Sequence, residues 1–166
     1  PESGGLVSDQ LLADLAAASR ILAARGVVDA FGHVSLRHPD NPNRYFMCRA
    51  KAPALAEPED IIEYNLDSEP CNANGRGSFL ERFIHGEIYK ARPDLNSVVH
   101  SHSPSVIPFG LVDTQIKAMF HNAAFLAAGV PVFDISEKYG VTDMLVSDGD
   151  KGQTFAECLG DKDIAL

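Results

Sequence analysis

Apolar side chains recur every three or four residues in two long stretches, the spacing that gives an α-helix one buried face. The first stretch runs from Ser8, a residue suited to begin a helix, to Gly26, a residue suited to end one. The second runs from Ser78 to Arg92, and Pro93 stops it. Both are predicted to be helices that pack on a core.

Shorter β-branched or alternating runs predict strands between these helices. The turn-rich segment 38–43 joins the first two strands as a hairpin. Strands are predicted at 34–37, 44–48, 61–66, 96–99 and 130–135, with another beginning at 164, and short helices at 104–111, 121–129 and 152–159. The pattern predicts an α/β fold in which residues 1–166 form a single domain.

Composition narrows the class of protein. A net charge of −9 and a pI near 5.0 argue against a nucleic-acid or anionic-membrane partner, because both favour clustered Lys and Arg. The three cysteines are far apart, which favours a reducing cytoplasm over a disulfide framework. No apolar run is long enough to span a membrane and no signal sequence is evident, so we expect a cytoplasmic protein.

His100 and His102 are the only closely spaced histidines in the chain. Residues two apart on a strand point to the same face, so both imidazoles project together near the strand end, just before Pro104. Two imidazoles on one face supply half of a metal site, although a hydrogen-bonded pair at a strand end is an equally simple interpretation.

Polar residues near other predicted strand ends are further candidates. Gly32 and His33 precede a strand, where backbone N–H groups and a side chain can face an anion or where a bulge can form. Arg49 and Lys51 follow the second strand of the hairpin, so they form a carboxylate-binding pair or a solvated basic loop. His38 is predicted to be a solvated turn residue.

Two further histidines lie on predicted helices. Glu81 and His85 are four residues apart and face one direction, so Glu81 is placed to reach the strand that carries His100. The alternative is that Glu81 only favours the helix dipole and His85 is structural. His121 begins a helix, where it is either a capping residue or a proton-transfer group.

Several of these residues occur in a specific order. The chain carries E-x-x-x-H, then R-P-D, then V-V-H-x-H-S, and it closes on L-G-D. On segments 32–35, 81–85, 92–103 and 159–161 the sequence resembles the class II aldolase and adducin family, and the likeness extends from about Leu11 to Leu166.

The resemblance implies a three-layer α/β/α fold around a largely antiparallel sheet, in homotetramers with active sites at subunit interfaces. It also implies a divalent metal, Zn²⁺ or Mn²⁺, bound by His100, His102 and a third histidine, with Glu81 as a further ligand or an acid/base group. The third histidine would follow the strand begun at Ile164, so the chain is expected to be truncated at its C-terminal end.

Departures from the family pattern bear on the substrate. Sugar-phosphate aldolases of the family bind phosphate through small hydroxyl and glycine donors, where this chain has His33, Arg49, Lys51 and Phe79. This set resembles members that decarboxylate hydroxylated aromatic acids or carboxylated ring-cleavage semialdehydes. His33, Ser35, Arg49 and Lys51 are therefore predicted to bind a carboxylated small molecule.

The predicted reaction is metal-dependent decarboxylation by a lyase, in which Glu81 or His121 returns a proton to carbon. The alternative enzyme is an aldolase, epimerase or dehydratase acting on a sugar or sugar phosphate. A different class of alternative is an adducin-like assembly domain that has lost catalysis.

Overall fold

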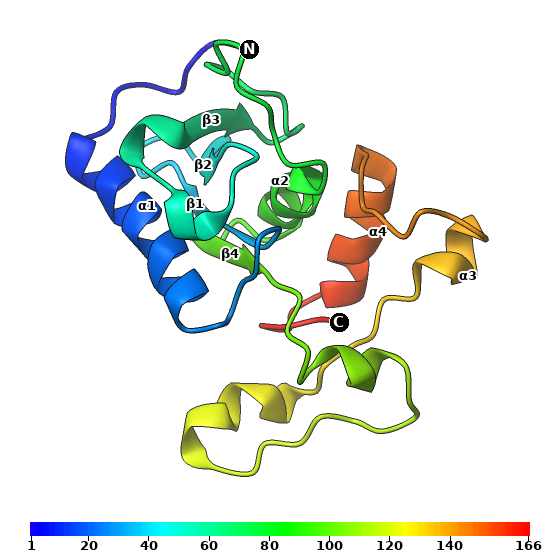
Figure 1. The fold of residues 1–166 in the computed structure, drawn as a ribbon. Helices are drawn as coiled ribbons and strands as arrows, with labels where there is room; N and C mark the ends of the chain where they lie inside the picture. Colours follow the sequence, from blue (N-terminus) through cyan, green and yellow to red (C-terminus); the bar gives the residue numbers. More distant parts are fainter.

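The computed structural model describes residues 1–166 and is built around a four-stranded sheet (Figure 1). The strand order is β3-β2-β1-β4, and every neighbouring pair is antiparallel. The hairpin of β1 and β2 and the strand that carries His100 are as predicted. The strands are β1 His33–Arg37, β2 Arg44–Cys48, β3 Ile61–Asn65 and β4 Ser97–His100.

Four α-helices and four short 3-10 helices accompany the sheet. The α-helices are α1 Asp9–Ala24, α2 Arg82–Ala91, α3 Ile135–Tyr139 and α4 Gly149–Leu159. The 3-10 helices are η1 Pro53–Leu55, η2 Pro58–Asp60, η3 Ile107–Gly110 and η4 His121–Ala128.

Alternate residues of each strand face two different helices. One face carries Val34, Phe46 and Ile61, which are buried with Leu15 of α1. The opposite face carries buried aromatic and aliphatic side chains that pack against Tyr89 of α2. Helix α4 packs on α2, farther from the sheet (Figure 1). The predicted α/β/α arrangement with an antiparallel sheet is confirmed.

Local capping explains where the outer helices begin. The Ser8 hydroxyl accepts a hydrogen bond from the Leu11 N–H at 3.2 Å, so α1 begins as predicted. The Asp148 carboxylate accepts from the Lys151 N–H at 2.9 Å, which starts α4 at Gly149, earlier than predicted. At Gly152 a Cβ would lie 2.7 Å from the Phe83 carbonyl oxygen, so glycine permits the close contact of α4 with α2.

Three predicted elements differ from the structure. Helix α2 begins at Arg82 rather than Ser78, and the preceding residues instead lead Phe79 and Glu81 toward the end of the sheet. Residues 130–134 form no strand, and neither does the segment begun at Ile164. The two segments exchange a pair of backbone hydrogen bonds, in which the Phe133 N–H donates to the Leu166 carbonyl and the Leu166 N–H to the Pro131 carbonyl.

Residues 104–134 form an arm that extends from the packed body (Figure 1, light green to yellow). Many large apolar side chains of this arm are exposed, which sets it apart from the first hundred residues. They include Leu111, Val112, Met119, Phe120, Phe125 and Val132. None of the helices combines the length and the apolar character needed to cross a bilayer.

Candidate metal centre

The donor atoms of three predicted metal ligands converge at the end of β4. The Nε2 atoms of His100 and His102 lie 2.9 Å apart, as expected for two side chains on one face of an extended segment. The Glu81 Oε2 atom lies 3.2 Å from His100 Nε2. Glu81 reaches this point because it occupies the N-cap position of α2, directly before the first helical residue.

His33 joins the same group through strand pairing. The register of β1 with β4 sets His33 directly opposite His100, and their ring centroids are 5.0 Å apart. Side-chain donor atoms of His33, Glu81 and His100 all lie within 4.8 Å of one another. A Cβ at Gly32 would lie 3.0 Å from the His100 carbonyl oxygen, so glycine before His33 allows β1 to begin beside β4.

The donor set suits a divalent transition metal. Imidazole nitrogens and a carboxylate oxygen are common ligands of Zn²⁺, and bonds of about 2.0 to 2.2 Å in tetrahedral geometry separate neighbouring ligand atoms by roughly 3.3 Å. The separations of 2.9 Å and 3.2 Å around His100 are close to this value. The donor types of His100, His102 and Glu81 and these two separations therefore fit a metal ion.

Asp29 is a neighbour of the centre that sequence reasoning missed. Its carboxylate lies 3.5 Å from His102 Nδ1, the ring nitrogen that does not face His100. Asp29 also accepts hydrogen bonds from the N–H groups of Phe31 and Gly32, and these contacts, led by that of Phe31, lower the pKa of its carboxyl. A carboxylate behind a metal-binding histidine orients the ring and fixes its tautomer.

Four polar side chains that extend behind His33 form a group that we call the buried row: His33, His85, Ser35 and Tyr89. His33 Nδ1 lies 2.7 Å from His85 Nε2, and His85 Nδ1 lies 2.6 Å from Ser35 Oγ. Ser35 Oγ in turn lies 2.7 Å from the Tyr89 hydroxyl. Ser35 is fully buried, so it supports the histidines from behind and does not face the centre.

Burial keeps the histidines of the buried row neutral. The pKa of His85 is lowered to about 3, chiefly because burial disfavours the charged ring. Burial, reinforced by the neighbouring His85, also lowers the pKa of His33 well below its ordinary value. His85 is therefore a buried structural residue, as the sequence allowed, and it also contacts His33 directly.

Glu81 differs from the histidines behind it because it contacts His100. Burial opposes its ionised form, yet the hydrogen bond and charge of His100 outweigh burial and lower the pKa of its carboxyl. An ionised Glu81 can serve as a metal ligand or accept a proton.

Arg49 and Lys51 both bind a carboxylate of the chain itself, that of Asp60. Arg49 Nε donates to Asp60 Oδ1 at 2.7 Å, and Lys51 Nζ donates to Asp60 Oδ2 at 2.5 Å. Burial opposes ionisation of Asp60, but these two contacts outweigh it and lower the pKa of its carboxyl to about 2. We call this group the Asp60 triad. It has one surplus positive charge because two cations share one carboxylate.

The Asp60 triad lies at the same end of the sheet as the centre. Arg49 follows β2, Asp60 precedes β3, and His33 begins β1, so antiparallel pairing brings these ends together. The Ala50 N–H also donates to the Gly77 carbonyl at 2.8 Å, which joins the loop to the segment that leads to Glu81.

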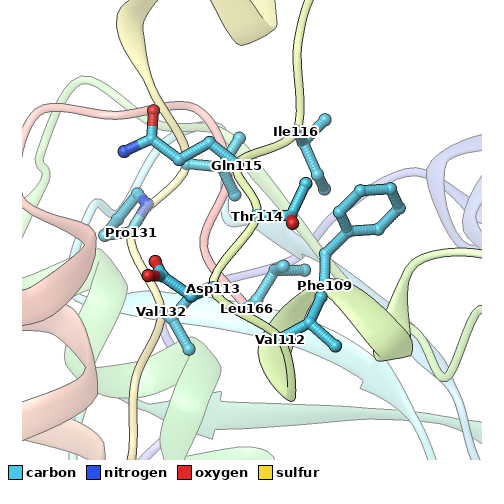
Figure 2. Close-up of a pocket in the computed structure, with 10 residues that line it drawn as sticks. Phe109, Val112, Asp113, Thr114, Gln115, Ile116, Pro131, Val132 and Leu166 are labelled. Atoms are coloured by element: carbon cyan, nitrogen blue, oxygen red, sulfur yellow. The ribbon is translucent and has the colours of Figure 1, made fainter.

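His121 lies apart from the centre. It is exposed at the start of η4, in the arm that extends from the body (Figure 1). A cavity of about 300 Å³ also lies on this arm, between residues 109–116 and 130–132, with Leu166 among its lining residues (Figure 2). It contains one carboxylate, Asp113, and none of the predicted site residues, so we assign it no chemistry.

The sequence matches the model of a known protein family. The family model described as the class II aldolase and adducin N-terminal domain matches residues 13–166. The chain belongs to this family. The resemblance drawn from the histidine and glutamate motifs is thereby confirmed over nearly the whole sequence.

Two relatives of the chain are named as decarboxylases. It is 38% identical over 143 residues to a protein of Talaromyces stipitatus named decarboxylase tropJ, covering 83% of this chain and 54% of that protein. It is 31% identical over 156 residues to the 3,4-dihydroxyphthalate decarboxylase of Arthrobacter keyseri, covering 82% of this chain and 62% of that protein. The chain therefore spans little more than half the length of these relatives.

Solved structures of the family share the fold at low sequence identity. An aldolase II superfamily protein from Pseudomonas syringae aligns with a TM-score of 0.77 at 20% identity, covering 96% of this chain and 64% of that one. The L-fuculose 1-phosphate aldolase from Glaciozyma antarctica aligns with a TM-score of 0.73 at 22% identity, covering 99% of this chain and 65% of that one. These likenesses support the fold.

Proposed function

We propose that the full-length protein is a divalent-metal-dependent lyase that decarboxylates a hydroxylated aromatic carboxylic acid or a carboxylated ring-cleavage semialdehyde. The observation that carries the proposal is the convergence of His100, His102 and Glu81 with His33, which stands against the ring of Phe79 at 4.7 Å. The similarity to two proteins named as decarboxylases supports the same reaction.

In this proposal His100 and His102 hold Zn²⁺ or Mn²⁺, and Glu81 is either a further ligand or the acid/base group. A divalent metal bound there supplies Lewis-acid stabilisation of the negative charge that remains on carbon when a carbon–carbon bond breaks. The third histidine implied by the family resemblance completes the ligand set.

The other residues bind and orient the substrate. The aromatic ring of Phe79 and the imidazole of His33 offer a flat wall for a planar substrate. The surplus positive charge of the Asp60 triad attracts its carboxylates. When CO₂ leaves, the electron pair of the broken bond stays on the substrate carbon, and that carbon takes up a proton.

Glu81 is the proton donor that this chain offers at the centre, after it has taken up a proton from solvent. The segment η4, which begins at His121, lies in the arm away from the packed body (Figure 1). In the proposed homotetramer with interfacial sites, His121 would act on a site that it shares with another subunit.

The test uses the full-length protein with Mn²⁺ or Zn²⁺. CO₂ release is measured from ortho-hydroxy aromatic carboxylic acids and carboxylated muconic semialdehydes, and aldehyde release is measured from sugar phosphates in parallel. Metal-dependent CO₂ release supports the proposal. Aldehyde release without CO₂ indicates a sugar-phosphate aldolase, and the absence of both products together with no bound metal indicates an assembly domain.

His100→Ala and His102→Ala should each abolish metal-dependent turnover, because each removes a ligand. His38→Asn is the matched control. His38 is buried rather than solvated as predicted, and its ring accepts the Asp40 and Asn41 N–H groups in the turn between β1 and β2, a contact that an Asn side chain can replace. Full activity in either Ala variant would contradict the assignment of the metal ligands.

A further inference from the structure

The buried row is a linear series of hydrogen bonds that is shielded from solvent and ends beside the metal centre. His85 and Ser35 are fully buried, Tyr89 is 1% exposed and His33 is 3% exposed, so no solvent reaches the contacts between them. Each member therefore has only its neighbours as partners. One atom of the row has no partner at all, the Nε2 of His33.

The direction of these hydrogen bonds follows from Tyr89, the end of the row opposite His33. The Tyr89 hydroxyl needs an acceptor for its hydrogen, and that acceptor is Ser35 Oγ at 2.7 Å, since the other neighbour of this hydroxyl, the Val98 N–H, is a donor. With Tyr89 donating to it, the Ser35 hydroxyl directs its own hydrogen to the remaining partner, His85 Nδ1, at 2.6 Å.

The same assignment of donors and acceptors extends to the two imidazoles. A neutral ring carries one N–H, so His85, which accepts at Nδ1, has its hydrogen on Nε2 and donates it to His33 Nδ1. His33 accepts at Nδ1 and therefore has its own hydrogen on Nε2. This is the ring nitrogen left to face the centre, because Nδ1 is engaged by His85.

The opposite direction is less favourable. If His33 Nδ1 donated to His85 and each later member donated onward, the hydrogen of the Tyr89 hydroxyl would be buried without an acceptor. A buried donor without a partner loses its hydrogen bonds to water and gains nothing in return. The opposite direction therefore leaves two groups unpaired, the Tyr89 hydrogen and the electron pair of His33 Nε2, whereas the direction that begins at Tyr89 leaves only the His33 Nε2–H unpaired, on a ring that lies beside Glu81 and His100.

We propose that the buried row holds His33 with its hydrogen on Nε2, so that His33 is a hydrogen-bond donor to the substrate and not a metal ligand. Its proximity to Glu81 and His100, within 4.8 Å, would otherwise mark it as a third ligand. A metal needs the free electron pair of an imidazole nitrogen, which the Nε2–H does not offer. Tyr89, Ser35 and His85 are then positioning residues.

The ligand class follows from the donor. An Nε2–H inside a buried site suits an anionic oxygen, such as a carboxylate or a phenolate. This assignment of the ligand rests on the proposed function, whereas the position of the hydrogen on His33 does not.

The first test is ¹⁵N NMR of the full-length protein with ¹⁵N-labelled histidine, before and after addition of Zn²⁺. We expect the His33 Nε2 to show the shift of a protonated nitrogen in both states, while Zn²⁺ moves the coordinating nitrogens of His100 and His102. An unprotonated His33 Nε2 that Zn²⁺ shifts directly would overturn the proposal.

The second test changes Tyr89, the end of the row opposite His33. Tyr89→Phe removes the hydroxyl that sets the direction, so we expect a mixture in which part of the His33 population has its hydrogen on Nδ1. Tyr45→Phe is the matched control, because the Tyr45 hydroxyl is also buried but contacts Ser68 and the Arg82 carbonyl outside the row. An unchanged tautomer in Tyr89→Phe would show that the row does not set it.

The third test separates ligands from donors by metal affinity. His33→Gln should leave the Zn²⁺ dissociation constant of the full-length protein unchanged, whereas His100→Ala should weaken it by at least about 100-fold. A comparable loss in His33→Gln would make His33 a ligand. A protein that releases no CO₂ but has His33 protonated at Nε2 would contradict the proposed function and leave this inference intact.

Discussion

The buried row and the Asp60 triad lie at the same end of the sheet, and they are stabilised in different ways. The buried row is neutral and enclosed, so its stability depends on the hydrogen bonds between its four members. The Asp60 triad is charged and lies nearer the surface, with 37% of the Arg49 side chain exposed. Neutral groups can be buried deeply at low cost, whereas charges need partners and solvent.

The comparison separates two tasks at the centre. The buried row fixes the position and hydrogen of one side chain, His33. The Asp60 triad provides a positive field that does not depend on exact placement of a single atom. Substitutions in the buried row should therefore act on stability in a way that does not change with pH, and substitutions in the triad should act in a way that does.

The largest effect is expected for Ser35→Ala. It removes two hydrogen bonds and leaves both His85 Nδ1 and the Tyr89 hydroxyl buried without partners. The free energy of unfolding should fall by about 2 to 4 kcal/mol, measured by urea denaturation. The decrease should be the same from pH 6 to pH 8, because the pKa of His85 lies far below that range.

Ser97→Ala on β4 is the control for Ser35→Ala. The Ser97 hydroxyl donates one hydrogen bond to the Ser35 carbonyl at 2.8 Å, and Ser97 is exposed, so this change removes a single hydrogen bond made by a side chain at the surface. We expect less than about 1 kcal/mol from this change. Equal losses in the two variants would show that the buried row is no more sensitive than the surface.

Asp60→Asn should have an intermediate effect that depends on pH. The pKa of Asp60 is about 2 in the folded protein against an ordinary 3.8, so the ionised carboxyl stabilises the fold above pH 4, and this contribution is lost as the pH falls through 2. At pH 7 the variant should be less stable by roughly 1 to 2 kcal/mol. The Asn oxygen can still accept from the Glu57 N–H that Asp60 binds.

Urea denaturation between pH 7 and pH 2.5 measures this difference. The stabilities of wild type and Asp60→Asn should approach each other below pH 4. A difference that stays constant over this range would contradict an ionised Asp60 held by Arg49 and Lys51.

The smallest effect on stability is expected for Arg49→Ala, under about 1 kcal/mol, because the ion pair is partly exposed and Lys51 remains bound to Asp60. Its effect should instead appear as a higher KM for the carboxylated substrate, since the triad loses its surplus charge. The double variant Arg49→Ala/Asp60→Asn restores that charge through Lys51. Recovery of KM in the double variant identifies charge as the cause, and an unchanged KM in Arg49→Ala would remove the loop from the site.

Elements with complete local signals were predicted well. Helix α1 has its N-cap at Ser8 and a glycine just beyond its end, so both limits are set by nearby residues. Helix α2 was predicted to begin at Ser78 because its apolar spacing starts there, but packing of Phe79 against His33 draws that segment into the site. Residues 130–134 have strand-like composition, but they form no strand because only Leu166 pairs with them.

The sequence by itself determined the pair His100 and His102, because residues two apart on an extended segment share a face whatever surrounds them. Glu81 was predicted to reach His100 from a helix that begins at Ser78, but it does so from the N-cap position of α2. The tertiary structure decided that His33 stands opposite His100, that Asp60 binds the two cations, and that the η4 segment with His121 lies in the arm. These contacts join segments far apart in the chain. They depend on strand register and helix packing, which no local pattern specifies.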